Sequence, residues 1–229
     1  MSVLEVKNYT KIYDSFAAAE NISFEVKEGE IFGLIGPNGA GKSTTLRAVA
    51  TILKPTSGEI IIGGHDLKNE PDKARKFLSY LPEEAGAYKN LTGRQYLEFM
   101  AALFIDDKQG QKDAIEFAEE ICELGDRLKS KVGTYSKGMT RKLLLARTVM
   151  SKPKLAILDE PTSGLDVINA LEIRNIIRDL AKKGMSVLLS GHNMLEIDYL
   201  CDRLAILIRG IFLRPAPRVN LRRNTMRAT

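Results

Sequence analysis

Residues 36–44 read Gly36-Pro37-Asn38-Gly39-Ala40-Gly41-Lys42-Ser43-Thr44 and fit the pattern G-x-x-x-x-G-K-[ST]. They follow an apolar run at 31–35 and precede a helical pattern at 42–50, the context that a phosphate-binding loop requires. Glycines let backbone N–H groups approach phosphates closely, while Lys42 reaches the β/γ-phosphates and the Ser43 hydroxyl is placed for Mg²⁺. The alternative, a tight turn that binds nothing, gives no reason for Lys-Ser at the helix start. We therefore interpret these nine residues as a nucleotide-binding loop.

A second acidic motif lies downstream, where the apolar run 155–158 ends in Asp159 and Glu160. A buried strand has no packing reason to end in two acids, whereas a Mg·nucleotide site needs one carboxylate near the metal and another near the attacking water. We assign Asp159 to the metal, through water, and Glu160 to the role of general base. Two solvated acids at a strand end are the alternative, which the phosphate loop disfavours.

Apolar runs alternate with helical patterns along most of the chain, and this predicts an α/β fold with a mostly parallel, covered sheet. A hairpin-like start, with a turn at 28–30, predicts an antiparallel β subdomain. Apolar spacings of i, i+3, i+4 and i+7 between 92 and 150 predict an inserted helical subdomain. The expected strands are 3–7, 22–27, 31–35, 59–62, 155–158, 186–190 and 204–208, and the other expected helices are 42–50, 167–182 and 194–200.

The composition is that of one soluble domain, with 44% hydrophobic and 28% charged residues among 229. No run approaches the roughly 20 apolar residues needed to span a bilayer, and the first residues lack a signal peptide's apolar run. We therefore expect a cytoplasmic location. The two cysteines, Cys122 and Cys201, are far apart and fit buried free thiols better than a disulfide or a metal cluster.

The net charge of +5 at first favours a nucleic-acid partner. However, seven arginines and no acidic residue follow Asp202, so that without them the remainder carries −2. Because the basic character belongs to a short tail, we expect no nucleic-acid binding by the folded body.

With these motifs in order, residues 2–210 resemble the ATP-binding cassette family. The sequence Tyr135-Ser136-Lys137-Gly138-Met139 starts a helix 23 residues before Asp159, where that family carries its signature. Residues 161–166, ending in Asp166, resemble its D-loop, and His192 ends a strand as its switch histidine does. Tyr13 lies where an aromatic residue stacks on adenine. Taken singly, Tyr13 could pack a turn, His192 could be a surface group, and Ser136 could be an ordinary helix N-cap.

The resemblance implies a P-loop NTPase (RecA-like) core and one nucleotide-binding domain over 1–229. Its parts would be a catalytic core with a β subdomain (1–90 and 151–210), a helical subdomain (91–150) and an atypical basic tail (211–229). It also implies a head-to-tail dimer, of two copies or with a paired ATPase subunit. Each ATP would lie between the phosphate loop of one subunit and Ser136, Lys137 and Gly138 of the other, and hydrolysis would involve Glu160, His192, Glu83 and Asp166. A separate membrane permease would hold this subunit on the inner face of the cell membrane.

Two motifs depart from the commonest family pattern. Glu83 stands where many cassettes carry the glutamine of the Q-loop; it can still ligand Mg²⁺ or orient water, but it adds a negative charge. The signature keeps its serine and second glycine, while Lys137 adds a cation. Both variants resemble cassettes of ABC-2-type exporters, including sodium-export and drug-export ATP-binding subunits.

The acid-free end is the third departure. We expect residues from about 211 to be a disordered extension, of the kind a frameshift produces; a short basic arm near an anionic membrane is the competing interpretation. For the whole chain, the alternative functions are a soluble cassette ATPase acting on DNA or ribosomes, and a nucleotide sensor that does not hydrolyse. The acidic body and the absence of a long coiled-coil insertion disfavour the first, and the retained Glu160 and His192 disfavour the second.

Overall fold

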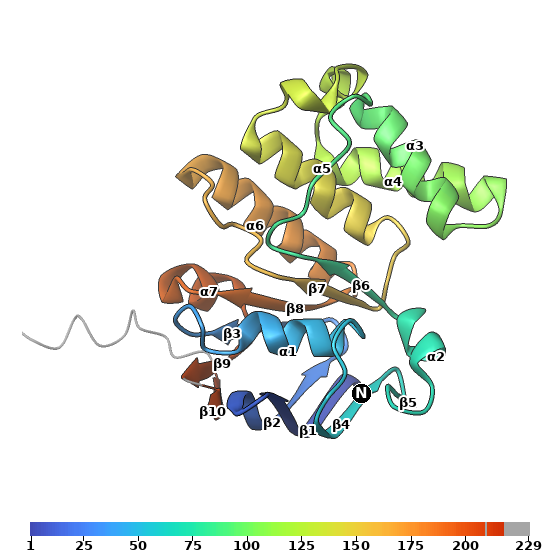
Figure 1. Ribbon diagram of the computed structural model, residues 1–229. Coiled ribbons are helices and arrows are strands. Elements are labelled where there is room, and N and C mark those ends of the chain that lie inside the picture. Colours follow the sequence, from blue (N-terminus) through green and yellow to red (C-terminus); the bar gives the residue numbers. More distant parts are fainter. Residues whose placement is uncertain (209, 218–229) are drawn as a thin grey trace, which may run out of the picture.

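In the computed structural model, which describes residues 1–208 and 210–217, the strands follow one another in the order β5-β4-β1-β2-β10-β9-β3-β8-β7-β6 (Figure 1). Their bounds are β1 Ser2–Tyr13, β2 Phe16–Lys27, β3 Ile31–Ile35, β4 Ser57–Ile62, β5 His65–Asp66, β6 Leu78–Leu81, β7 Leu155–Leu158, β8 Ser186–Gly191, β9 Arg203–Ile208 and β10 Ile211–Pro217. The helices are α1 Lys42–Val49, α2 Pro71–Arg75, α3 Gly93–Phe104, α4 Lys108–Cys122, α5 Lys137–Val149, α6 Val167–Lys182 and α7 Met194–Leu200, with short 3-10 turns at Gly125–Lys129 and Val132–Thr134.

Five strands form the parallel block that carries the site. β3 pairs in parallel with β8 and β9, β7 with β8, and β6 with β7. Alternate residues face opposite sides: Ile31 and Ile35 belong to the hydrophobic core that includes the helical subdomain, while Phe32 and Leu34 belong to the core on the α1 side. Since both faces are covered, β3 and β7 are apolar throughout, as the parallel-sheet prediction requires. The α/β prediction is confirmed.

The antiparallel β subdomain is also confirmed, although its hairpin differs from the expected one. β1 pairs along its length with β2 and on its other edge with β4. The turn at 28–30 instead connects β2 to β3, two strands that are not neighbours in the sheet. The expected turn is therefore the connection between the antiparallel subdomain and the parallel block.

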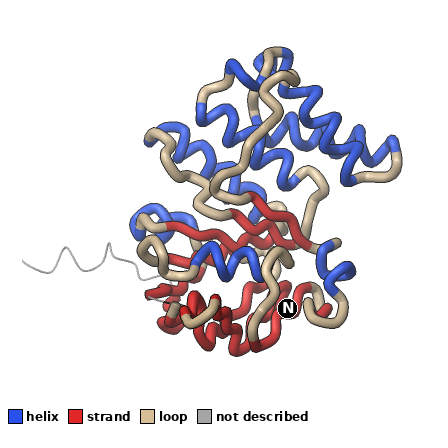
Figure 2. The backbone as a smooth tube through the Cα atoms, viewed as in Figure 1, coloured by secondary structure: helices blue, strands red, loops and turns tan. Residues whose placement is uncertain are grey.

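The helical subdomain stands above the sheet and is built from α3, α4 and α5 (Figure 2). α3 begins after Thr92 with a capping box, because Thr92 accepts from the Gln95 N–H and the Gln95 side chain accepts from the Thr92 N–H. α5 begins after Ser136, whose hydroxyl accepts from the Met139 N–H at 3.2 Å. These caps fix where the helices start and place the signature sequence at the exposed end of α5.

The expectation of disorder from residue 211 is wrong for the first seven residues. Residues 211–217 form β10, which pairs antiparallel with β9 and parallel with β2 at Ile211 and Glu20. Gly210, with a φ of 79°, makes the reversal between β9 and β10 possible because glycine lacks a Cβ. The rest of the expected tail, 218–229, lies outside the described residues.

Within the described ranges, 1–208 and 210–217, no helix has the length and apolar character needed to cross a membrane.

Candidate functional site: a nucleotide-binding centre

The phosphate loop joins β3 to α1, and its shape depends on Gly41. Gly41 is the N-cap residue of α1 with a φ of 94°, and an added Cβ would collide with the carbonyl oxygen of Ala18. No side chain caps this helix, in contrast to α3, α4, α5 and α6. The first N–H groups of α1 are therefore available to an anion, and the helix dipole favours a negative charge there.

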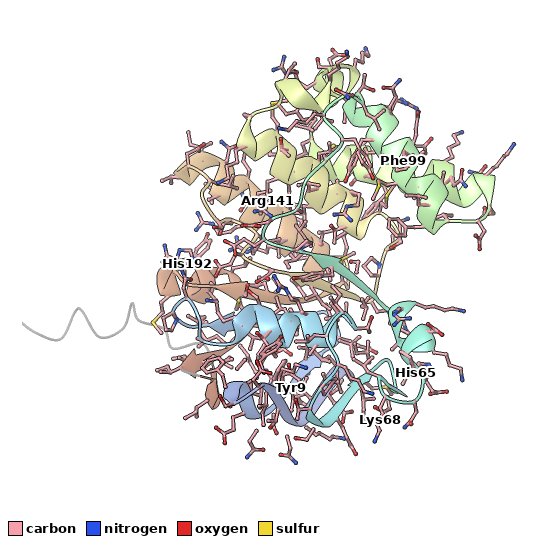
Figure 3. The ribbon with its side chains drawn as sticks, viewed as in Figure 1. Tyr9, His65, Lys68, Phe99, Arg141 and His192 are labelled. Atoms are coloured by element: carbon pink, nitrogen blue, oxygen red, sulfur yellow. The ribbon has the colours of Figure 1, made fainter. Side chains whose placement is uncertain are left out.

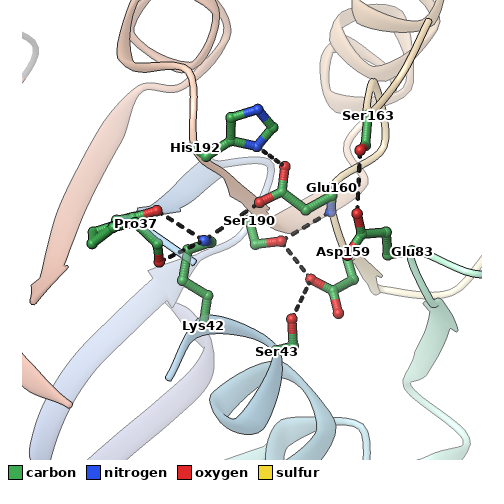
Figure 4. A network of polar contacts seen from close by, with 10 residues as sticks. Pro37, Lys42, Ser43, Glu83, Asp159, Glu160, Ser163, Ser190 and His192 are labelled. Carbon is green, nitrogen blue, oxygen red and sulfur yellow. Dashed lines mark hydrogen bonds and ion pairs between the residues drawn. The ribbon is translucent and has the colours of Figure 1, made fainter. Parts of the chain in front are cut away.

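Lys42 lies inside the loop. Its ammonium donates to the carbonyl oxygens of Gly36 at 2.8 Å and Pro37 at 3.2 Å, and lies 3.4 Å from Glu160 Oε1 (Figure 4). The side chain is only 6% exposed. A cation held this way, at a helix N-terminus and next to a carboxylate, is suited to a phosphate chain that approaches from the open side of the loop.

Asp159 and Ser43 meet beneath the loop. The Ser43 hydroxyl donates to Asp159 Oδ1 at 3.1 Å, and the Ser190 hydroxyl donates to the same oxygen at 2.6 Å. Tyr80, at the end of β6, donates to Asp159 Oδ2 at 3.3 Å, and burial, followed by the charge of Asp159, raises the pKa of Tyr80 to about 12. Three hydroxyl groups from separate elements therefore hold a carboxylate that is 1% exposed.

Glu160 follows in an unusual backbone conformation, with a φ of 48°. Its N–H donates to the Ser190 hydroxyl at 2.9 Å, and its Oε2 lies 2.9 Å from His192 Nδ1. With Glu160 ionised, this contact requires Nδ1 of His192 to carry the proton. Left-handed residues that are not glycine gather at functional sites, where the surroundings hold them in place. Here the two restraints on Glu160 come from Ser190 on β8 and from His192 on the loop that follows β8.

Glu83 lies on the segment that leaves β6. Its Oε1 accepts from the Ser163 hydroxyl at 3.2 Å, and its carbonyl oxygen accepts from Arg141 Nη2 at 3.0 Å. Glu83 is thus connected to the D-loop on one side and to α5 on the other. The glutamate that replaces the usual glutamine takes part in a defined hydrogen-bond arrangement.

A groove of about 440 Å³ opens over the phosphate loop. Residues of three kinds line it: the loop and α1, the carboxylates Glu83 and Glu160, and the aromatic pair Tyr13 and Phe16. Tyr13 is 44% exposed, with Lys11 Nζ 5.0 Å from its ring centre. The groove combines a polar end for phosphates with an aromatic end for a base. The residues of the loop and α1 in this lining include Asn38, Gly39, Ala40, Lys42, Ser43 and Thr44.

The signature residues lie elsewhere. Ser136 and Lys137 are exposed at the start of α5, and Ser136, Lys137 and Gly138 are not among the residues that line this groove. At Gly138 an added Cβ would collide with the Asn169 carboxamide. Asp166, the N-cap of α6, accepts from the Asn169 N–H at 3.0 Å, and that hydrogen bond is the main reason its pKa is lowered. The signature therefore packs against the start of α6, the helix that follows the D-loop, and not against the phosphate loop of the same chain.

The donor set is suited to Mg²⁺ together with a nucleotide. The Ser43 hydroxyl and the Asp159 carboxylate are hard oxygen donors at the mouth of the loop, of the kind that Mg²⁺ uses with phosphates. Among the residues that the structure describes, no group of three or more His, Cys, Asp or Glu side chains could hold a metal ion by itself. Phosphate oxygens and water would complete the coordination of a Mg²⁺ ion held by Ser43 and Asp159.

The sequence alone did not identify Phe16, Tyr80, Arg141, Ser163 or Ser190 as site residues. Ser190 lies near the end of β8, two residues before His192, and alternation along that strand could have placed it on the site. Arg141 lies one helical turn beyond the signature, and its burial has no sequence signal that distinguishes it from a surface arginine.

A parallel sheet with a phosphate loop between β3 and α1, and with acids at the end of a neighbouring strand, defines a P-loop nucleotide-binding ATPase. The family model described as ABC transporter matches residues 19–163. The chain belongs to the ABC transporter family, as one of its ATP-binding, ATP-hydrolysing subunits.

Three curated relatives illustrate this similarity. The chain is 40% identical over 210 residues to the uncharacterized ABC transporter ATP-binding protein YhcH of Bacillus subtilis, covering 91% of this chain and 68% of that protein. It is 38% identical to the probable multidrug ABC transporter ATP-binding protein YbhF of Escherichia coli, covering 91% and 36%. It is 38% identical to the bacitracin transport ATP-binding protein BcrA of Bacillus licheniformis, covering 94% and 70%. The chain thus spans about two thirds of YhcH and BcrA and about a third of YbhF.

Among solved structures, one described as the ATP-binding subunit of an ABC transporter superposes with a TM-score of 0.82 at 30% identity, covering 94% of this chain and 90% of that one.

Proposed function

We propose that this chain is the ATPase subunit of an ABC-2-type exporter and that it works on the inner face of the cell membrane with a separate permease. Names of relatives support the exporter class: BcrA is a bacitracin transport protein and YbhF a probable multidrug transporter subunit. The observation that carries the proposal is the separation of the two phosphate-binding elements, since the groove at Lys42 contains none of Ser136, Lys137 and Gly138.

A second subunit supplies the missing half of the site. The exposed N-terminus of α5 presents Ser136 to a phosphate held by another copy, where a helix N-terminus and a hydroxyl stabilise negative charge. Next to it, Val167 is 80% and Ile168 is 72% exposed at the start of α6. Apolar side chains gathered beside a polar binding element are typical of a surface that a partner covers. ATP would therefore join two subunits, and hydrolysis would separate them.

Within one subunit the residues take distinct roles in hydrolysis. Lys42 and the N–H groups of the loop hold the phosphates, Tyr13 stacks on the base, and Ser43 and Asp159 would hold Mg²⁺. When bound, Mg²⁺ neutralises charge that develops on the phosphates. Glu160 accepts a proton from the attacking water, and His192 Nδ1 orients its carboxylate. Glu83 orients the water or the metal from the opposite wall of the groove, next to the D-loop that ends in Asp166.

The permease would dock beside Glu83, on the helical subdomain. The segment after β6 and helix α3 carry exposed apolar side chains: Tyr88, Phe99, Leu103 and Phe104. Tyr88 and Phe99 stack edge to face, with ring centres 5.5 Å apart. We call these four residues the α3 patch. Its continuity with the Glu83 segment would connect a docked permease to the nucleotide groove.

Purification of tagged Glu160→Gln from native membranes with Mg·ATP, followed by mass spectrometry, tests this proposal. We expect an integral membrane protein with several spans to copurify. Leu103→Asp, introduced in the same background, should release it without changing ATP affinity. Ile52→Asp, which alters an exposed apolar residue outside the α3 patch, should leave the complex intact. Recovery of ribosomal or DNA-bound partners instead would favour the soluble ATPase.

A further inference from the structure

Arg141 is a buried cation that none of the recognised motifs explains. It lies on α5 and is 7% exposed, with its side chain directed from α5 toward the segment that follows β6 (Figure 3). Nη2 donates to the Glu83 carbonyl oxygen at 3.0 Å. Nη1 is fully buried and has no hydrogen-bond partner among the residues that the structure describes. A guanidinium held this way is costly unless a nearby negative charge offsets it.

Two carboxylates supply that charge. Burial lowers the pKa of Arg141, whereas the negative charges of Glu83 and Asp159 raise it. The neighbouring residue Lys142 is also buried, but its ammonium pairs with Glu172 on α6 at 2.9 Å. Of these two buried cations on α5, Arg141 is therefore the one that faces the nucleotide centre.

The position of Arg141 explains how a glutamate can stand at residue 83. A carboxylate there joins Asp159 and Glu160 around a groove that must also accept the negative phosphates of ATP. Lys42 is already engaged by the loop carbonyls and by Glu160. A second buried positive charge, on the far side of Glu83, reduces the repulsion between this carboxylate and the phosphates.

We propose that Arg141 is the positioning residue of Glu83: Nη2 fixes the Glu83 backbone, and the guanidinium charge offsets the Glu83 carboxylate so that the groove can bind ATP. This inference rests on the proposed role of Glu83 in the nucleotide centre. The same contacts connect α5 to the D-loop, because the Glu83 carboxylate also accepts from the Ser163 hydroxyl.

A double-mutant cycle on Arg141→Met and Glu83→Gln tests the proposal, with ATP affinity measured in EDTA and again in Mg²⁺. Arg141→Met alone should weaken ATP binding roughly tenfold under both conditions, because it leaves a carboxylate without its counter-charge. Adding Glu83→Gln should restore the affinity to that of Glu83→Gln alone, since the charge that needed offsetting is gone. If the effects of Arg141→Met and Glu83→Gln on the free energy of ATP binding are additive, the proposal is wrong.

A second measurement tests the backbone position of Glu83 rather than the charge of its carboxylate. Hydrogen exchange of the backbone at 82–86 should speed up in Arg141→Met, because the hydrogen bond to the Glu83 carbonyl is lost. Lys142→Met is the matched control: it removes a neighbouring buried cation of the same helix, and its effect on ATP binding should not depend on Glu83→Gln. If Lys142→Met were coupled to Glu83→Gln in ATP affinity as strongly as Arg141→Met is, the assignment would be wrong.

If Arg141→Met does not fold, the double variant decides, because the proposal predicts that it folds and binds ATP; an unfolded double variant overturns it. Failure of the proposed exporter function would look different, since no membrane protein would copurify with Glu160→Gln while the ATP affinities measured in this cycle would be unaffected.

Discussion

The Ser190 hydroxyl donates to Asp159 Oδ1 over 2.6 Å and accepts from the Glu160 N–H over 2.9 Å. One side chain on β8 thus fixes the two acids that end β7. Glu160 needs this restraint because its left-handed backbone, with a φ of 48°, is unfavourable for a residue with a Cβ. The geometry of the acidic pair is therefore a property of two neighbouring strands, and it yields a prediction about a residue outside the recognised motifs.

Ser190→Ala should lower turnover about tenfold while ATP still binds, because Glu160 loses the bond that orients it. The unpaired buried N–H should also cost about 1–3 kcal/mol of stability. Ser186→Ala is the matched control, since Ser186 is equally buried on β8 and accepts from the Gly29 N–H at 3.0 Å, away from the site. Denaturant unfolding should show similar losses for both, and phosphate release should fall for Ser190→Ala alone. Equal turnover in the two variants would remove Ser190 from the site.

Tyr13→Ala should weaken ATP binding roughly tenfold, the scale of one base–aromatic stacking interaction. Tyr13→Phe should bind normally, because it keeps the ring. Inorganic tripolyphosphate, which has no base, should bind both variants and the unaltered protein equally well. Fluorescence titration with each ligand measures this. If Phe16→Ala shows the loss and Tyr13→Ala does not, Phe16 is the stacking residue.

Gly138→Ala should lower stability by about 1–3 kcal/mol, because the added methyl group collides with the Asn169 carboxamide. Asn169→Ala removes that group, so the double variant should recover most of the loss in thermal unfolding. Without such recovery, the packing of the signature on α6 would not explain the glycine.

The parallel block could be predicted because its signals are local. The apolar strands at 31–35 and 155–158 and the helix at 167–182 have the bounds expected from the sequence. β6 was missed, since Leu78–Leu81 is short and carries Ser79 and Tyr80. The expected disorder was wrong for 211–217 because the arginine-rich composition outweighed a pairing with β9 and β2 that only the fold reveals.

The residues of the candidate site likewise fall into those with a local sequence signal and those without one. Lys42, Ser43, Asp159 and Glu160 stand in contiguous motifs, and the structure brings them into one network. Ser190 and Arg141 act through contacts across 31 and 58 residues of sequence, to Asp159 and Glu83 respectively. Such contacts depend on strand order and helix orientation, which a single sequence specifies only through the complete fold.

Steady-state phosphate release by Glu160→Gln tests the central claim, that this centre hydrolyses ATP with Glu160 as general base. The variant should bind Mg·ATP with unchanged affinity and lose about 10²-fold or more in turnover. Lys42→Ala should instead lose ATP binding itself, because its ammonium holds the phosphates. Near-normal phosphate release by Glu160→Gln, under conditions in which the unaltered protein is active, would contradict the account.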